Sequence, residues 1–468
     1  MLTYSFEDIG SVSLYEHLYR NIKEDIIKGA LAAGDKLPSK RSFAKNLGVS
    51  VITVENAYAQ LIAEGYVYSL PKKGFFVADL VGAIAVNAGA PTNDIIEVKA
   101  EKVYFADFTS NQTAPENFPF SVWTKLMREI IADSGAELMV NPPSRGIYEL
   151  REAIALHLRD FRGMRVNPEQ IVIGAGTEYL YGLIIQLLGH DKIYAVENPG
   201  YKKIFKIYRS NNVNVGYVGM DENGLRIEEL EKSHSSVAHI SPSHHFPTGL
   251  VIPISRRYEL LAWAAKSSER YIIEDDYDCE FRFVGKPIPS LQSIDAAEKV
   301  IYINTFTKSL APTIRISYMI LPIHLTKRYC DKMSFYSCTV SNFEQYTLAR
   351  FIREKYFEKH INRMRNFYRT QRDMILNCIK ESRLASCVKI TEEDSGLHFL
   401  LSLKTKLSEK EFLSSLAEKG VRLSCLSEYY YDNIDDTHIY IINYSSIKPD
   451  RIRDAVARIY ESAMPKEV

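Results

Sequence analysis

The sequence of 468 residues predicts a two-part fold, in which a small head of three helices and a β-hairpin precedes a large α/β body. Three observations predict it. Capped helices followed by a hairpin occupy the first 79 residues, and beyond residue 104 short apolar runs alternate with helical segments. Hydrophobic residues make up 46% of the chain and charged residues 25%, which is typical of a folded globular protein and excludes disordered and low-complexity classes.

The head, residues 1–79, begins with an amphipathic helix and ends with a hairpin. Apolar residues recur at helical spacing over residues 14–29, where a glycine closes the pattern. Two short β-branched and aromatic runs, 66–69 and 75–77, flank the polar turn 70–74. This pattern predicts two paired strands.

Two further helices lie between these elements. Ser39 can cap a helix over residues 40–47, Gly48 breaks it, and Ser50 can cap a second helix that runs to about Glu64. Three helices with a tight turn and a hairpin indicate a winged helix-turn-helix domain.

The remainder of the chain is predicted to be a linker, residues 80–103, and an α/β domain, residues 104–468. Continuous apolar runs in this domain are typical of strands that are buried on both faces of a mainly parallel sheet. A smaller α+β subdomain is expected from about residue 345. The predicted strands include residues 171–173, 193–196, 237–240, 271–273 and 300–303.

Charge and cysteine content exclude several classes of protein. Lys plus Arg equals Asp plus Glu at 58 each, so any contact with nucleic acid must be local. The six cysteines are scattered without ligand spacing, which argues against a structural metal or a disulfide framework.

The acidic amino terminus lacks a signal-peptide pattern, and no stretch approaches the ~20 apolar residues of a membrane span. We therefore expect a cytoplasmic protein with no membrane partner.

Residues 37–77 resemble the winged helix of the GntR superfamily over the whole motif. The resemblance implies binding to double-stranded operator DNA, with the second helix of the pair in the major groove and the wing on phosphates and the neighbouring minor groove. A protein-binding module is the alternative. The residues expected to contact DNA are Ser39, Arg41, Ser50, Val51, Ile52, Thr53, Lys72, Lys73 and Gly74.

One residue of the recognition helix departs from that family. GntR members commonly carry Arg directly after the serine that opens the helix, where this chain has Val51. We therefore expect weaker or differently specified base readout, which can include apolar contact with a thymine methyl group.

The most informative residue of the body is Lys308, which follows an apolar strand. Thr305 and Thr307 precede it and Arg315 follows it, so two hydroxyls and a guanidinium can clamp a phosphate beside an amine nucleophile. This arrangement is that of a lysine that binds a phosphorylated aldehyde.

Acidic residues follow another strand, residues 271–274. A carboxylate at Asp275 can keep a pyridine nitrogen protonated, and the phenol of Tyr277 can hydrogen-bond a ring hydroxyl. Side chains alternate along a strand, so Asp276 and Asp278 would point away from Asp275 and Tyr277. They are expected to be surface or capping groups. Metal binding is the alternative for this cluster, although no His or Glu lies at useful spacing.

A glycine turn lies earlier in the body, where a strand leads into a helix. There Ala175, Gly176 and Thr177 can offer backbone N–H groups and a hydroxyl to a phosphate at a helix amino terminus.

Taken in chain order, these features resemble the fold type I enzymes that use pyridoxal 5'-phosphate (PLP), and most closely the aminotransferase-like domain of MocR/GabR-type regulators. The segment SPSHHFPTG, residues 241–249, belongs to the same series. The resemblance implies that Lys308 holds PLP as a Schiff base, that Tyr201 stacks on the pyridine face, and that His245 contacts a cofactor oxygen. It also implies a homodimer.

Two departures from the family bear on function. His245 stands where Gln is usual, so the protonation behaviour of that contact is open. Ile441 stands at about the place of the arginine that grips the substrate α-carboxylate in aminotransferases of this fold. Lys203, or an arginine such as Arg422, could instead hold a carboxylate of different geometry, or PLP itself could be the signal.

These observations predict a DNA-binding transcription regulator with a PLP-binding body. That body would sense an amine effector, for example an ω-amino acid such as GABA, or PLP itself. Without the arginine we expect no net turnover and at most a partial transamination. The alternatives are a working aminotransferase with an accessory head and a scaffold that binds no cofactor.

Overall fold

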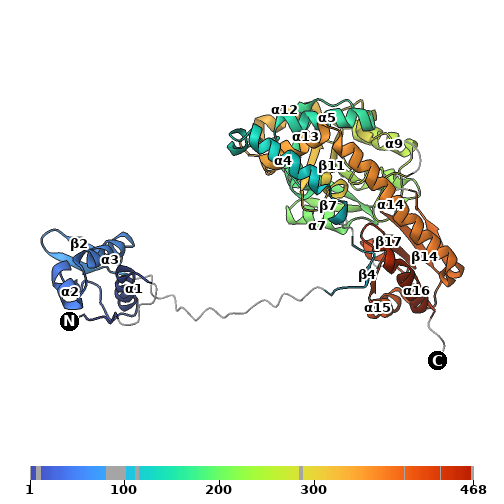
Figure 1. Cartoon of the computed structure of the whole chain (residues 1–468). Helices are drawn as coiled ribbons and strands as arrows, with labels where there is room; N and C mark the ends of the chain where they lie inside the picture. Colours follow the sequence, from blue (N-terminus) through green and yellow to red (C-terminus); the bar gives the residue numbers. More distant parts are fainter. Residues whose placement is uncertain are drawn as a thin grey trace. The chain divides into compact units, whose positions relative to one another are not determined.

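The computed structural model describes residues 2–6, 12–80, 102–110, 115–283, 288–394, 396–432 and 434–464. The chain forms two compact units, residues 1–100 and 101–468, which are described separately below (Figure 1). Most of the predicted linker, residues 81–101, lies outside the described residues. Within the described part of the chain, no helix is long and apolar enough to cross a membrane.

The first unit is a winged helix-turn-helix, as predicted. Its elements in chain order are α1 (Leu14–Ile27), β1 (Lys36–Leu37), α2 (Lys40–Leu47), α3 (Val51–Ala63), β2 (Val67–Leu70) and β3 (Gly74–Val77). The two-residue strand β1 pairs antiparallel with β3, and β3 pairs antiparallel with β2. The sequence did not reveal β1, because a two-residue strand has no measurable periodicity.

The predicted caps begin the two helices of the DNA-binding motif. The Ser39 hydroxyl accepts a hydrogen bond from the Ser42 N–H, and the Ser50 hydroxyl accepts one from the Thr53 N–H. Each cap satisfies a backbone donor that the first turn leaves unpaired, which contributes about 1 kcal/mol. Apolar side chains from all three helices and the hairpin form the core of the head, including Leu18, Ile22, Phe43, Val54, Tyr58, Leu61 and Val77.

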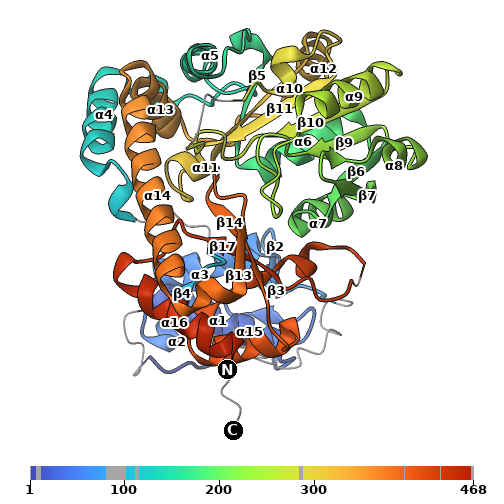
Figure 2. The same ribbon diagram turned by 90° about the vertical axis from the view of Figure 1, so that its right-hand side faces the viewer.

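The second unit is built on an eight-stranded mixed sheet (Figure 2). Five strands, β11, β10, β9, β6 and β7, run parallel as neighbours, whereas β12 is antiparallel to both β5 and β11. The sheet order is β5 (Ile171–Ala175), β12 (Ile316–Ile320), β11 (Val300–Thr305), β10 (Tyr271–Asp275), β9 (Val237–Ile240), β6 (Ile193–Asn198), β7 (Asn214–Asp221) and β8 (Gly224–Leu225).

Helices cover both faces of this sheet, so successive strand residues enter different cores. Ile272 packs in one hydrophobic cluster and its neighbour Ile273 in another. This explains the continuous apolar runs in the sequence. The helices of this part are α4 (Phe120–Asp133), α5 (Tyr148–Arg162), α6 (Thr177–Leu188), α7 (Lys202–Ser210), α8 (Ile227–Lys232), α9 (Ile254–Ala265), α10 (Leu291–Ile294), α11 (Phe306–Ser309), α12 (Ile323–Met333) and α13 (Asn342–Arg353).

The long helix α14 (Tyr356–Glu381) leads from this part to a smaller α+β subdomain (Figure 2). Its four-stranded antiparallel sheet has the order β13 (Val388–Thr391), β14 (His398–Leu403), β17 (Ile439–Asn443) and β16 (Ser424–Cys425). Helices α15 (Glu409–Glu418) and α16 (Ile452–Ala463) pack with it, and β15 (Val421–Arg422) pairs with β4 (Ala106–Asp107).

Candidate functional site

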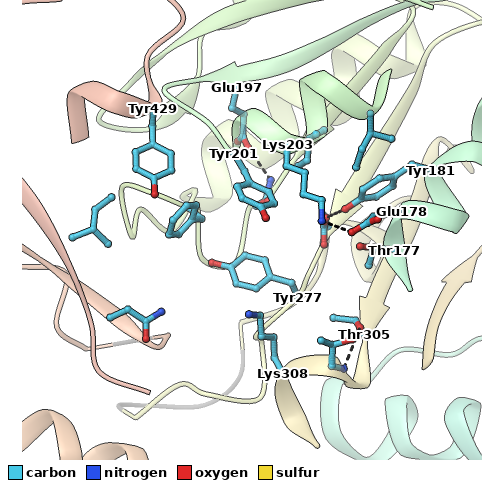
Figure 3. A pocket seen from close by; sticks show the side chains of 18 of the residues that line it. Thr177, Glu178, Tyr181, Glu197, Tyr201, Lys203, Tyr277, Thr305, Lys308 and Tyr429 are labelled. Atoms are coloured by element: carbon cyan, nitrogen blue, oxygen red, sulfur yellow. Dashed lines mark hydrogen bonds and ion pairs between the residues drawn. The ribbon is translucent and has the colours of Figure 1, made fainter. Parts of the chain in front are cut away.

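A cavity of about 350 Å³ lies in the second unit, where β10 and β11 end and where α6 and α7 begin. Ligands commonly bind at this edge of α/β sheets, because loops and helix amino termini converge there. Figure 3 shows Lys308, Tyr277 and Tyr201 directed into it from different elements. The predicted cofactor residues that line it are Thr177, Tyr201, Asp275, Tyr277, Thr305, Thr307, Lys308 and Arg315.

Three predicted cofactor residues do not line the cavity. Ala175 donates its N–H to Thr339 Oγ1 at 3.0 Å. Gly176 lies under the guanidinium of Arg315, so its role is to leave room. His245 is buried, with Nδ1 2.7 Å from Thr248 Oγ1, and its neighbour Phe246 lines the cavity instead.

Asp275 is held in the cavity wall by residues that the sequence analysis missed. One carboxylate oxygen accepts a hydrogen bond from the Tyr181 hydroxyl, and His239 Nε2 lies 3.5 Å from the same oxygen. The other oxygen, Oδ1, is buried and has no hydrogen-bond partner among the described residues. A pyridinium N–H would satisfy it. Tyr181 follows Thr177 by four residues on α6, so helical periodicity could have placed both on one face.

A second group of lining residues suits a phosphate. Thr177 begins α6, where unpaired backbone N–H groups favour an anion. The hydroxyls of Thr305 and Thr307 lie 2.9 Å apart, and Arg315 lines the same cavity. Arg315 has a φ of 50°, an uncommon backbone conformation for a residue other than glycine. The residues present therefore fit the phosphate and the ring nitrogen of PLP.

Lys308 lies on the short helix α11 and is partly buried. Burial lowers the pKa of its side-chain ammonium from 10.5 to about 8, although the Asp278 carboxylate opposes this shift. A substantial fraction of the amine is therefore neutral near pH 8. Since only the neutral amine attacks a carbonyl group, this environment favours reaction with an aldehyde.

A second buried carboxyl group, Glu197, lines the cavity beside His245. Burial raises the pKa of Glu197 from 4.5 to about 8 and lowers the pKa of His245 from 6.5 to about 3. Both groups are therefore uncharged at neutral pH. Glu197 Oε2 lies 3.4 Å from His245 Nε2 and accepts a hydrogen bond from the Ser241 N–H.

The expectation that Asp276 and Asp278 are surface or capping groups is wrong, because both are buried. Asp276 forms an ion pair with Arg162 and accepts a hydrogen bond from the Tyr302 hydroxyl. Asp278 Oδ2 lies 2.8 Å from His244 Nδ1. Strand alternation ends with β10 at Asp275, so it does not govern the turn that follows.

The small subdomain contributes Ile441 and Asn443, both from β17, to the lining of the cavity. Lys203 also lines the cavity, where it forms an ion pair with Glu178. Arg422 does not line it, and its guanidinium lies 3.7 Å from Asp107. Of the described lining residues, Lys203, Lys308 and Arg315 are the basic ones. Ile441, at the position where an arginine is expected in aminotransferases, brings no positive charge to the cavity.

In the head, the recognition helix α3 exposes apolar side chains. Val51 is 42% exposed and Ile52 is 68% exposed, so both are available to a partner. The adjacent Glu55 forms an ion pair with Lys40 at 2.6 Å. The predicted contact residues Arg41, Lys72 and Lys73 are exposed as well, whereas Thr53 and Gly74 are half-buried.

Comparison with known proteins relates both units to described families. Residues 14–77 match the gntR family of bacterial regulatory proteins, and residues 105–459 match the class I and II aminotransferases. An uncharacterized HTH-type transcriptional regulator of Bacillus subtilis, YdeL, is 38% identical over 448 residues, which is 96% of each chain. The probable rhizopine catabolism regulatory protein MocR of Rhizobium meliloti is 29% identical over 95% of this chain and 92% of its own.

The chain belongs to the MocR/GabR-type transcriptional regulators. Its body also has the fold of solved aminotransferases. The kynurenine aminotransferase of Pyrococcus horikoshii superimposes with a TM-score of 0.68 at 23% identity, covering 81% of this chain and 97% of that enzyme. The second unit of this MocR/GabR-type chain therefore has the predicted fold of a fold type I aminotransferase-like domain.

Proposed function

We propose that this MocR/GabR-type protein binds operator DNA through its winged helix, holds PLP on Lys308, and changes its DNA binding when an amine effector or PLP itself occupies the cavity. The observation that carries the proposal is the convergence of Lys308, Asp275 and Arg315 on one cavity in a chain that also contains a gntR-family head. We also propose a homodimer, whose symmetry would set the spacing of the operator half-sites.

The residues have separable roles toward the cofactor. PLP would supply an aldehyde and an electron-withdrawing ring to an amine that enters the cavity. Asp275 would accept the ring N–H, Arg315 and the start of α6 would hold the phosphate, and Tyr201 would cover one ring face. Glu197, which lines the cavity, and the neighbouring His245 stay uncharged, so they add no charge to the cavity at neutral pH.

Sensing fits the cavity better than turnover does. An α-amino acid would lack its usual carboxylate partner, because Ile441 lines the cavity at that place. The basic group left near the mouth, Lys203, is already paired with Glu178. We therefore expect effectors that bind through the amine, with at most a partial transamination. An ω-amino acid such as GABA is one example, since its carboxylate lies farther from the amine.

The decisive experiment compares wild-type protein with Lys308→Ala. We expect wild-type protein to show an absorbance band of covalently held PLP, and its affinity for DNA from its own promoter region to change when PLP or an amine is added. Lys308→Ala should lose the covalent band and the response to the amine but still bind DNA. An unchanged band in Lys308→Ala would overturn the role of Lys308, and no binding of either protein to DNA would overturn the regulatory role.

A working aminotransferase is the second candidate, because the body matches the class I and II aminotransferases over residues 105–459. It is tested by incubating the protein with an amino donor and a keto acid. Continuous product formation over many turnovers would favour the enzyme, whereas a single half-reaction would favour the sensor.

A further inference from the structure

The loop between β9 and α9 places an imidazole directly behind Tyr277. His244 is buried, with its Nδ1 2.8 Å from Asp278 Oδ2 and 3.3 Å from the Tyr277 hydroxyl oxygen. Its other ring nitrogen, Nε2, is buried and has no hydrogen-bond partner among the described residues. Nδ1 is therefore the atom through which the ring hydrogen-bonds.

The neighbours of Nδ1 decide where its proton lies. An ionised Asp278 carboxylate can only accept a hydrogen bond, so Nδ1 carries a proton and donates it. The Tyr277 hydroxyl oxygen also lies near Nδ1, so it accepts a hydrogen bond from the same N–H group. Burial raises the pKa of the Tyr277 phenol well above its usual value, so the phenol keeps its proton. That proton must point elsewhere, and Tyr277 lines the cavity.

The small subdomain holds the imidazole in place. A Cβ built on Gly396, whose φ is +72°, would lie only 1.8 Å from His244 Cε1, so this backbone packs directly against the ring. The ring of His398 lies 4.8 Å from that of His244, centroid to centroid. Two further titratable groups face His244: Glu392 of the same subdomain, whose pKa is raised by burial, a shift that His244 opposes, and His245, the next residue in the chain. The backbone at Gly396 therefore blocks movement of the His244 ring toward that side.

We propose that His244 is a positioning residue, which, held by Asp278, directs the Tyr277 hydroxyl proton into the cavity toward the 3-oxygen of bound PLP. The inference rests on the proposed binding of PLP. A hydrogen bond donated to the cofactor's 3-oxyanion stabilises that charged form and lowers the pH at which the bound cofactor takes up a proton. Without the His244 N–H group, the Tyr277 hydroxyl is free to point its proton away from the cavity.

The test is a pH titration of the absorbance band of the full-length, PLP-loaded protein, with wild type, His244→Phe, Tyr277→Phe and the double variant. We expect His244→Phe to raise the titration midpoint by about 0.5 pH unit or more, in the same direction as Tyr277→Phe. The double variant should match Tyr277→Phe alone, because His244 acts through the phenol. His244→Asn retains an N–H donor near the position of Nδ1, so it should restore part of the wild-type midpoint.

His398→Phe is the matched control. This histidine is also buried and packs on His244, but its Nε2 lies 3.2 Å from the Pro247 carbonyl oxygen rather than near Tyr277. The substitution keeps an aromatic ring packed on His244 and removes no group that hydrogen-bonds Tyr277, so it should leave the midpoint unchanged. If His244→Phe does not fold, the smaller His244→Ala replaces it, alone and combined with Tyr277→Phe, and the same upward shift is expected.

Two results would overturn the inference while the proposed function stands. One is a PLP band in His244→Phe with the wild-type midpoint. The other is a His244→Phe shift that persists in full when Tyr277 is already Phe. The absence of any PLP band in the wild-type protein would instead refute the proposed cofactor, and with it this role of His244.

Discussion

The guanidinium of Arg315 lies against the backbone of Gly176, so closely that a Cβ added to the glycine would be 2.3 Å from Arg315 Nη2. Gly176 also has a φ of 94°, which a residue with a side chain rarely adopts. The glycine immediately before α6 is thus required both by the turn and by the arginine that would face the phosphate.

Gly176→Ala should therefore displace Arg315 and weaken PLP binding. The loss of one charge-assisted hydrogen bond, roughly 1.5–3 kcal/mol, corresponds to about tenfold or more in the dissociation constant. The measurement is a titration of apoprotein with PLP, followed by absorbance. Gly182→Ala, in the helix that follows Gly176, is the control, because the nearest atom to the added Cβ, Asn211 Oδ1, is 4.0 Å away. Equal affinities of the two variants would contradict the prediction.

Ile441→Arg should give the cavity an anchor for an α-carboxylate. A charge-assisted pair of this kind contributes about 1.5–3 kcal/mol, so affinity for L-alanine should rise about tenfold or more. The change in the PLP absorbance band on adding L-alanine measures it. Ile441→Met, which fills similar volume without charge, should respond like wild type. A shared response of the Arg and Met variants would show that the position does not face the effector.

Glu197 should make the stability of the body depend on pH. Its folded-state pKa is raised by burial from 4.5 to about 8, so its contribution is fully present below pH 4.5 and is lost as pH rises toward 8. Glu197→Gln cannot ionise. The melting temperature of the apo variant relative to wild type should therefore increase between pH 5 and pH 8, by about 2 °C or more.

The exposed Glu418→Gln substitution is the control for that pH series, and its difference from wild type should stay constant. A constant difference for Glu197→Gln as well would mean that the buried carboxyl group titrates normally in the folded protein.

The wing should supply charge to DNA binding rather than sequence preference. The double variant Lys72→Glu, Lys73→Glu should weaken binding to all DNA sequences and reduce the slope of log affinity against log salt by about two.

Ile52→Ser should instead alter the preferred bases, because Ile52 is exposed on the recognition helix. Binding titrations at several salt concentrations measure both effects.

Lys28→Glu tests whether any surface charge would act in the same way. Lys28 lies at the end of α1, outside the predicted contact residues, and pairs with Glu24. The salt slope of this variant should remain close to that of wild type. A loss equal to that of the wing variant would argue for a general charge effect.

Much of the fold could be predicted because its signals are local. Helical spacing at Leu18 and Ile22 predicted α1, and Ser39 and Ser50 predicted the starts of α2 and α3. The antiparallel placement of β12 between β5 and β11 could not be predicted, because sheet order depends on packing between segments that lie far apart in the chain.

The sequence by itself determined the chemistry available: a lysine after a strand, threonines beside it, and a winged helix ahead of it in the chain. Only the tertiary structure decided which partners meet. It turned Phe246 rather than His245 into the cavity, buried Asp278 against His244, and kept Arg422 out of the cavity's lining. The physical reason is range. Caps and periodicity act over a few residues, whereas burial and ion pairing depend on elements that the fold brings together from more than thirty residues apart in the chain, as the 34-residue separation of His244 and Asp278 illustrates.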